Sequence, residues 1–318
     1  MLAESTSNRT SRGDTQGLVR AEGCAYCMGT IFNIVAYGTH LDHLRSALAK
    51  ALDEARRLDE MLSNYRPESE LSRVNRLAGQ GPVNTSPEFC QFLSACLAYS
   101  RASEGSFDIT VGPLVKAAGF YKGTGCLPRP EAVVQALDKV GYKNIILDEQ
   151  NMTVRFAQEG VELDPGGVGK GFAVDKMAEI LKHDQVRAAL ISAGGSTIYA
   201  LGAPPNQPGW NVTIKDPRKP SQTAEVVTLK NEAISTSGNY EKFFWADGRI
   251  WGHILDPRTG YPARGTLAVS VIAPRTVDSE AWAKPCFVMG RAWTEKHRPH
   301  DFRVFYCEDK PGVPSAWL

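Results

Sequence analysis

Residues 164–175 read DPGGVGKGFAVD, and this glycine-rich stretch is the most informative part of the chain. Four glycines and one lysine here lead directly into a helical pattern at residues 171–182. Glycines let backbone N–H groups come close to a ligand, and the N-terminus of the following helix favours an anion. Lys170 adds a positive charge to the same turn. The stretch predicts an anion-binding turn. The alternative is a tight turn with a surface lysine. The stretch matches neither the Walker loop nor the G-x-G-x-x-G motif of dinucleotide-binding proteins.

Helical and strand-like patterns alternate through the rest of the chain, with no linker or internal repeat between them. This predicts one α+β unit with two lobes at residues 21–318, after a disordered tail at residues 1–20. Thr39 is expected to cap a helix at residues 41–62, and Ser86 with Pro87 to begin the next helix. The other expected helices are at residues 130–140, 171–182 and, as the last one, 278–290. Strands are expected at residues 28–37, 144–148, 188–192, 210–214, 224–229, 233–236 and 267–272.

Composition excludes some classes of function. The formal net charge is +1, from 36 basic and 35 acidic residues, so nothing favours nucleic acid as a partner. No run of eighteen apolar residues occurs, which predicts no membrane span. The seven cysteines include Cys24 and Cys27 as a lone C-x-x-C, and we expect ordinary reduced thiols. Residues 1–20 contain no apolar signal region, so a cytoplasmic location is expected, with export after removal of a signal as the alternative.

A second polar segment lies in the C-terminal half. Ser235, Thr236 and Ser237 precede a glycine, and His253 begins the run HILDPRTG at residues 253–260. Polar side chains gathered in this way are costly to bury unless each has a partner. A ligand is one source of partners, and a hydrated loop with a satisfied histidine is the alternative.

Several blocks of this sequence occur together, in order, in one family. DPGGVGKGFAVD at 164–175, STSG at 235–238 and HILDPRTG at 253–260 resemble the signature blocks of the FAD:protein FMN transferases, the ApbE-like enzymes. Supporting blocks are MGT at 28–30, SNYRPESELSRVN at 63–75, FDITVGPLV at 107–115, AGGSTIYALG at 193–202 and FVMG at 287–290. The resemblance runs from about residue 23 to residue 290. It implies a T-fold-like α+β protein with FAD between its lobes, which cleaves FAD with the help of Mg²⁺ and attaches FMN to a Ser or Thr of a partner flavoprotein.

The resemblance also assigns roles to particular residues. His253 would bind FAD from one lobe and is our candidate for the base that deprotonates the acceptor hydroxyl, a role worth about 10²–10⁴-fold in rate. Stabilisation of the charge on the diphosphate oxygens would come from Lys170 and backbone N–H groups. The remaining residues expected to contact FAD are Met28, Tyr65, Ser106, Phe107, Asp108, Asp164, Ser235 and Ser237.

The implied metal site departs from the family pattern. The family uses a backbone carbonyl, matched here by Gly167, together with an Asp and a Thr four residues apart on a late helix. Those two positions hold Glu280 and Lys284, and Pro285 follows inside the expected helix. Mg²⁺ prefers oxygen ligands, and a protonated lysine cannot be one. We favour the interpretation that the Lys284 ammonium takes the place of the metal and faces the diphosphate. In the alternative, the local register differs and Asp278 supplies the carboxylate.

The altered metal pair keeps other functions open. Water in place of the acceptor hydroxyl would give hydrolysis of FAD to FMN and AMP. A non-catalytic FAD-binding protein and a flavoenzyme that keeps its FAD for redox chemistry are the two further alternatives to the transferase.

Overall fold

The computed structural model describes residues 17–240 and 242–318. The helices are α1 (Leu41–Leu62), α2 (Glu70–Leu77), α3 (Pro87–Ala102), α4 (Gly112–Ala117), α5 (Pro130–Leu137), α6 (Gly169–His183), α7 (Thr276–Met289) and α8 (Arg291–His297). The strands are β1 (Val19–Cys27), β2 (Thr30–Gly38), β3 (Val83–Asn84), β4 (Ile145–Asp148), β5 (Thr153–Phe156), β6 (Ala188–Ala193), β7 (Thr197–Leu201), β8 (Trp210–Asp216), β9 (Lys219–Leu229), β10 (Glu232–Gly238), β11 (Phe243–Ala246), β12 (Arg249–Gly252), β13 (Thr266–Ala273), β14 (Arg303–Glu308) and β15 (Ala316–Trp317).

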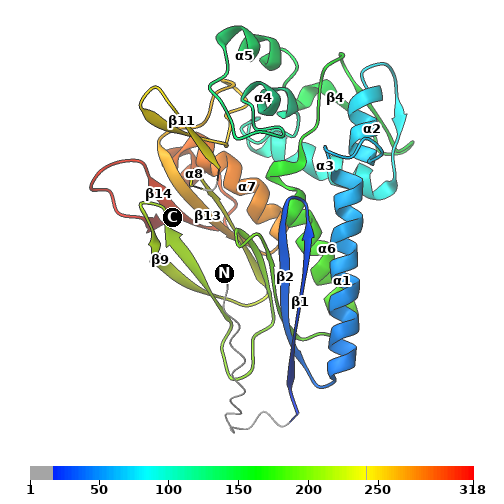
Figure 1. Ribbon diagram of the computed structural model, residues 1–318, viewed down its shortest axis with the longest axis vertical. Helices are drawn as coiled ribbons and strands as arrows, with labels where there is room; N and C mark the ends of the chain where they lie inside the picture. Colours follow the sequence, from blue (N-terminus) through cyan, green and yellow to red (C-terminus); the bar gives the residue numbers. More distant parts are fainter. Residues whose placement is uncertain (1–16, 241) are drawn as a thin grey trace.

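The molecule is built on one antiparallel sheet with the order β1-β2-β6-β7-β10-β13-β14-β15. Helices α1, α6 and α7 pack against one face of this sheet. The β8–β9 hairpin packs on the opposite face, and its apolar side chains form a second hydrophobic core with those of the sheet. The smaller sheet β3-β5-β4 and helices α2 to α5 form a further group at the top of Figure 1. We call this group the upper lobe and the large sheet with its helices the sheet lobe. The α+β class predicted from the sequence is confirmed.

The long helix α1 follows from its apolar spacing. Leu44, Leu48, Ala55 and Leu58 are buried on one side, where α1 lies against β1 and α6. The predicted bounds, residues 41–62, are those of the structure. The predicted cap was wrong, because His40 rather than Thr39 is the N-cap residue and its side chain makes no capping hydrogen bond.

The start of α3 is as predicted. Ser86 is the N-cap, its side chain accepts a hydrogen bond from the backbone N–H of Phe89, and Pro87 occupies the first turn. Proline is tolerated there because that N–H has no partner within the helix. Local side-chain chemistry thus sets this helix boundary.

The N-terminal hairpin corrects two expectations. Residues 28–37 were expected as one strand, but β2 begins at Thr30, and Met28 and Gly29 form the two-residue turn between β1 and β2. Both turn residues have positive φ, at 50° and 71°, as a hairpin turn of type I′ requires. Strand β1 was missed, and it begins at Val19, inside the tail expected at residues 1–20. Residues 1–16 lie outside the described residues.

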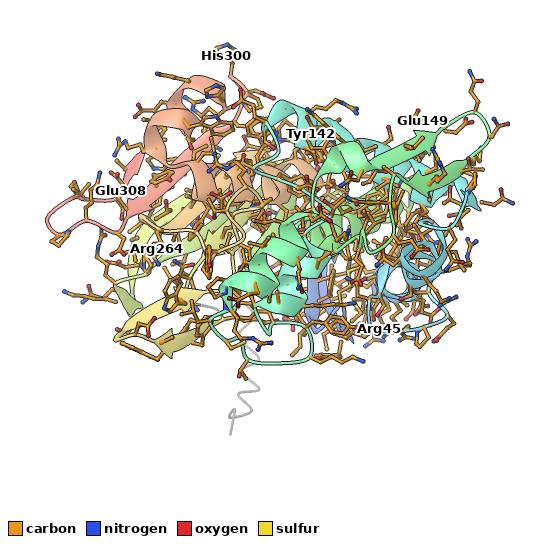
Figure 2. All side chains as sticks on the ribbon, turned by 90° about the horizontal axis from the view of Figure 1, so that it is seen from above. Arg45, Tyr142, Glu149, Arg264, His300 and Glu308 are labelled. Atoms are coloured by element: carbon orange, nitrogen blue, oxygen red, sulfur yellow. The ribbon has the colours of Figure 1, made fainter. Side chains whose placement is uncertain are left out.

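The cysteines of this chain, all of them among the described residues, form no disulfide bonds. Cys24 is exposed and Cys27 is buried on β1, and all seven cysteines are free. Arg45, Glu149 and His300 project from the outer edge of the molecule (Figure 2). Within residues 17–240 and 242–318, no helix has the length and apolar character needed to cross a bilayer.

Helix α7 begins two residues before its predicted start and continues through Pro285 to Met289. It is followed by the short helix α8, so it is not the last helix. The Asp175 carboxylate on α6 accepts hydrogen bonds from the backbone N–H groups of Thr276 and Val277, at 2.7 and 2.9 Å. A side chain of α6 therefore caps α7, which fixes the relative position of the two helices.

The crossing of α6 and α7 depends on a glycine. A Cβ on Gly171 would lie 2.7 Å from the Thr276 carbonyl oxygen and 2.9 Å from the Val277 Cα, both backbone atoms. We expect Gly171→Ala to lower the free energy of unfolding by about 1–3 kcal/mol, the usual cost of overpacking. Urea denaturation measures this, with Gly169→Ala as the control, because its nearest neighbour would be the Pro165 Cβ at 3.4 Å. Equal stability of the two variants would contradict the close packing.

Candidate functional site

The glycine-rich turn leads into α6 as predicted. Pro165–Gly167 form a short 3-10 turn, and α6 starts at Gly169, two residues before the expected position. One Asp164 carboxylate oxygen accepts from the Gly166 N–H at 2.8 Å, and the other accepts from the Asn64 amide at 3.3 Å. Burial raises the pKa of Asp164. Asp164 therefore holds the turn in shape before any ligand arrives.

A carboxylate from α7 occupies the N-terminus of α6. One oxygen of Glu280 lies 2.5 Å from the Lys170 Nζ, and the other accepts from the Gly171 N–H at 2.5 Å. The Thr197 hydroxyl donates to the first oxygen at 3.4 Å. Burial acts to raise the pKa of Glu280, but the charges of Lys170 and Lys284 outweigh it and hold that pKa below its ordinary value. An anion at a helix N-terminus is stabilised by the helix dipole.

Lys284 lies one helical turn after Glu280 and reaches from α7 to strand β10. Its Nζ donates to the Ser237 hydroxyl at 3.0 Å, and its aliphatic stem passes the Cα of Gly167. Lys284 and Glu280 thus share one face of α7, as residues four apart on a helix do. Two ammonium groups, those of Lys170 and Lys284, flank the glycine-rich turn.

Asp278, the alternative carboxylate, is engaged elsewhere. It accepts hydrogen bonds from the Tyr99 hydroxyl at 2.5 Å and from the Arg275 guanidinium at 2.6 and 2.8 Å. The carboxylate beside the glycine-rich turn is that of Glu280, so the register that the alternative requires is not the one in this structure.

His253 follows strand β12, and its imidazole faces the lysines. Its Nδ1 is 3.1 Å from the carbonyl oxygen of Lys242. A carbonyl can only accept, so Nδ1 carries the hydrogen and Nε2 keeps its lone pair. Burial, together with the charges of Lys284, Lys242 and Lys170, lowers the pKa of His253 to about 4. The histidine is therefore neutral near pH 7 and able to accept a proton at Nε2.

The two serines of strand β10 have different partners. Ser235 and Ser237 lie on the same face of β10, as alternate strand residues do. The buried Ser235 hydroxyl is 2.8 Å from the Ser279 hydroxyl of α7, whereas Ser237 receives Lys284. Ser237 therefore reaches the lysines and Ser235 joins β10 to α7.

Three expected nucleotide contacts are largely used inside the protein. The Ser106 hydroxyl donates to the Ser103 carbonyl at 2.6 Å. The Asp108 carboxylate accepts from Thr110 and from the Tyr142 N–H, at 2.6 to 2.8 Å, and burial raises its pKa. The buried Phe107 ring lies beside Gly167. Of these three residues, Phe107 is the one whose side chain lies against the glycine-rich turn.

Two tyrosines form an aromatic platform at the edge of the upper lobe. The ring of Tyr65 stacks on that of Tyr121, with centroids 5.1 Å apart and an angle of 9°. Tyr65 is 57% exposed, and the Lys122 ammonium lies 6.0 Å from the centroid of its ring. Tyr121 was not predicted as part of the site, although the glycine-rich loop GFYKGTG at residues 119–125 was a signal for it.

Met28, another residue expected to contact FAD, lies in the β1–β2 turn and is partly buried against the main core.

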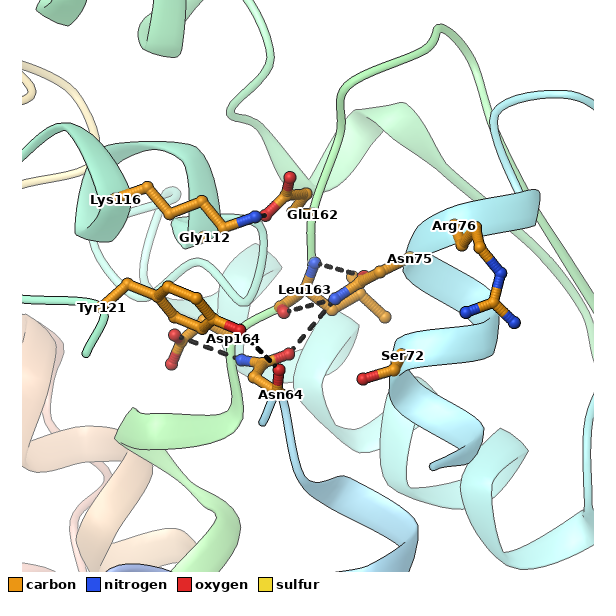
Figure 3. Close-up of a pocket in the computed structure, with 10 residues that line it drawn as sticks. All are labelled: Asn64, Ser72, Asn75, Arg76, Gly112, Lys116, Tyr121, Glu162, Leu163 and Asp164. Atoms are coloured by element: carbon orange, nitrogen blue, oxygen red, sulfur yellow. Dashed lines mark hydrogen bonds and ion pairs between the residues drawn. The ribbon is translucent and has the colours of Figure 1, made fainter. Parts of the chain in front are cut away.

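A polar cavity of about 230 Å³ borders Asp164 and Tyr121 (Figure 3). The Asn75 amide links the Asn64 side chain to the backbone of Leu163, with bonds of 2.8 to 3.3 Å. Tyr121 donates its hydroxyl hydrogen to the Asn64 carbonyl at 2.8 Å. The cavity therefore lies between the Tyr121 side of the aromatic platform and Asp164.

The residues present do not fit Mg²⁺ at the position the resemblance implies. Both Glu280 oxygens already bind donors, and Lys284 brings a positive charge. At about 4 Å and an effective dielectric constant of about 20, two unit charges interact with about 4 kcal/mol, and a divalent cation near an ammonium is repelled roughly twice as strongly. No group of three or more His, Cys, Asp or Glu in the described part of the chain could hold a metal ion.

The run at residues 253–260 was expected either to meet a ligand or to form a hydrated loop, and its polar side chains divide between site and turn. Asp256 and Arg258 pair with each other at 2.8 and 2.9 Å in a turn. Of this run, His253 is the residue on whose pKa the charges of Lys284, Lys242 and Lys170 act. In this α+β protein the turn at the start of α6, the two lysines and His253 therefore lie together and form a candidate site for an anion.

Comparison with known proteins places this chain in a family. The family model of the ApbE family matches residues 28–302. A protein of Treponema pallidum named FAD:protein FMN transferase is 33% identical over 279 residues, which are 83% of this chain and 77% of the relative. The crystal structure of the ApbE protein from Thermotoga maritima matches with a TM-score of 0.85 and 29% identity, covering 94% of this chain and 96% of that one. The apo flavinyl transferase ApbE of Pseudomonas stutzeri matches at 0.82 and 26%, covering 96% of each chain. This chain belongs to the ApbE family.

Proposed function

We propose that this protein is an FAD:protein FMN transferase. The Ser or Thr hydroxyl oxygen of a partner flavoprotein attacks the phosphorus of the FMN half of FAD. A new oxygen–phosphorus ester bond forms, the bond from that phosphorus to the bridging oxygen breaks, and AMP leaves. The hydroxyl proton goes to a base, for which we propose Nε2 of His253. The name carried by the curated relatives and the shared fold support this reaction.

The observation that carries the proposal is the gathering of positive charge around a neutral histidine. Lys170, Lys284 and Lys242 each act on the pKa of His253, and α6 directs its N-terminus to the same place. Such a site stabilises the charge that develops on diphosphate oxygens during transfer. We assign the diphosphate to the turn at Gly167, between Lys170 and Lys284.

The rest of FAD is assigned to the surfaces on either side. A flat ring system packs well on the exposed Tyr65 ring, and Met28 is proposed as a second contact. The Phe107 ring and the backbone of Ser106 and Asp108 are proposed to line the nucleotide part, since the side chains of those two polar residues have internal partners.

The altered metal position favours one second candidate. Glu280 and Lys284 give no site that fits Mg²⁺, so a protein that binds FAD and transfers nothing, or only hydrolyses it, is the alternative. We propose the cytoplasm as the place of action, consistent with free thiols at all seven cysteines.

One experiment separates these functions. The protein is incubated with FAD and an acceptor peptide that carries a Ser or Thr flavinylation motif, in Mg²⁺ or in EDTA. The transferase is expected to add the mass of FMN less one water to the peptide and to release an equal amount of AMP. AMP without modified peptide would establish hydrolysis, and retained FAD without AMP would establish binding only. Lys170→Ala is expected to abolish transfer, while Lys176→Ala, which removes a lysine paired with Glu179 on the same helix, is not.

A further inference from the structure

The charges around the glycine-rich turn suggest how this site holds a diphosphate. Helix α7 projects Glu280 and Lys284 from successive turns toward the N-terminus of α6. Glu280 is buried, and its carboxylate accepts from Lys170, Thr197 and Gly171, so three of its about four acceptor positions are taken by protein donors. Lys284 lies across Gly167, with its ammonium at the Ser237 hydroxyl.

The lysine charges in this group act together on their neighbours. Besides burial, the ammonium groups of Lys284, Lys242 and Lys170 lower the pKa of His253, because a positive charge opposes protonation of the imidazole. Against the effect of burial, Lys170 and Lys284 hold the pKa of Glu280 below its ordinary value. The same ammonium charges repel a metal cation and attract the phosphate groups of an anion.

We infer that the Lys284 ammonium takes the role of a divalent cation here, so that this site binds the diphosphate of FAD without a metal. The inference rests on the proposed use of FAD. An ammonium is a compact point charge with three donors, and lysine binds phosphate groups in this way. Its stem is held between Gly167 and strand β10, so the charge is already in position when FAD arrives.

The test measures FAD binding by fluorescence titration in EDTA and in Mg²⁺. The dissociation constant of the native protein is expected to agree in the two buffers to within about twofold. Lys284→Met is expected to raise it about tenfold or more in both buffers, because the charge–phosphate contact is lost. Riboflavin, which has no phosphate, is expected to bind both proteins equally. Lys296→Met on the exposed side of α8 is the matched control and is expected to bind FAD as the native protein does.

A variant that keeps the positive charge separates loss of the charge from a general folding defect. Lys284→Arg is expected to keep binding in EDTA, since it retains a cation at the same place. The double variant Glu280→Asp with Lys284→Thr is expected to bind FAD more tightly in Mg²⁺ than in EDTA. Native binding that requires Mg²⁺, or unchanged binding by Lys284→Met, would overturn the inference alone. Absence of FAD binding in both buffers would overturn the proposed function as well.

Discussion

Replacing His253 by Ala is expected to lower the rate constant of FMN transfer by about 10²- to 10⁴-fold, with FAD binding largely preserved. The imidazole is neutral near pH 7, and Nδ1 is anchored to the Lys242 carbonyl, so Nε2 is the proton acceptor. Lys170 and Lys284 remain in the variant and continue to attract the diphosphate. The loss should therefore appear in kcat and not in the dissociation constant of FAD.

The pH dependence of the same reaction follows from the low pKa of His253. In the free protein this pKa is about 4, because burial and three lysines oppose protonation. The acidic limb of kcat/KM reports the free protein and is expected to fall only as the pH approaches about 4. A bound diphosphate adds negative charge, which favours the protonated imidazole and raises the pKa. The acidic limb of kcat is therefore expected at higher pH than that of kcat/KM, and both limbs are expected to vanish in His253→Ala.

His300→Ala is the matched control for a lost histidine, because His300 lies at the outer edge of the molecule (Figure 2). It is expected to transfer FMN at the native rate. If His253→Ala also keeps the native kcat and loses only affinity, His253 contributes to binding and another group accepts the proton.

Elements set by local chemistry could be predicted from the sequence. The bounds of α1 followed from apolar spacing, and the start of α3 followed from Ser86 and Pro87. Strand β1 was missed because the β1–β2 turn uses Met28 at positive φ, a residue that does not mark such turns. The Thr39 cap failed for a similar reason, since the chain enters α1 through His40 with no side-chain cap.

The site was predictable in its parts but not in its pairings. The glycine-rich turn, Lys170, Ser237, His253 and Lys284 do come together, and these were found from linear motifs. The sequence did not indicate that Glu280 caps α6 and binds Lys170, because those residues are 110 positions apart. Nor did it indicate that Asp108 would be satisfied by a local turn and by the Tyr142 N–H, which depends on how the upper lobe packs.

Replacing Glu280 by Gln is expected to lower the free energy of unfolding of the ligand-free protein by about 3 kcal/mol, the lower end for loss of one partner of a buried ion pair. The Glu280 side chain is 2% exposed and that of Lys170 is 24% exposed. The glutamine carbonyl can still accept from Gly171, but its NH₂ group would face the Lys170 ammonium where the native protein has a carboxylate oxygen. Urea denaturation at neutral pH measures the loss.

The pH dependence of this loss has a definite sign. The folded-state pKa of Glu280 is lowered, so its stabilising contribution is present above the unfolded pKa and is lost as the pH falls through the folded value. The difference in stability between the native protein and Glu280→Gln is therefore expected to shrink in acid. A difference that stays constant down to acid unfolding would show that packing, and not the ion pair, accounts for the effect.

FAD should partly reverse the destabilisation, because its diphosphate and the Glu280 carboxylate compete for the same positive charges. With the carboxylate gone, one competitor for the Lys170 ammonium is removed, and the variant is expected to bind FAD more tightly than the native protein does. Ligand at about 100 times its dissociation constant stabilises a protein by about 2.7 kcal/mol, comparable to the expected loss. Thermal unfolding with and without FAD measures this, and Glu280→Asp, which keeps the charge, is the control. A smaller FAD-induced rise in Tm for Glu280→Gln than for the native protein would mean that Glu280 helps to bind FAD, and that the carboxylate does not act as a stand-in for the ligand.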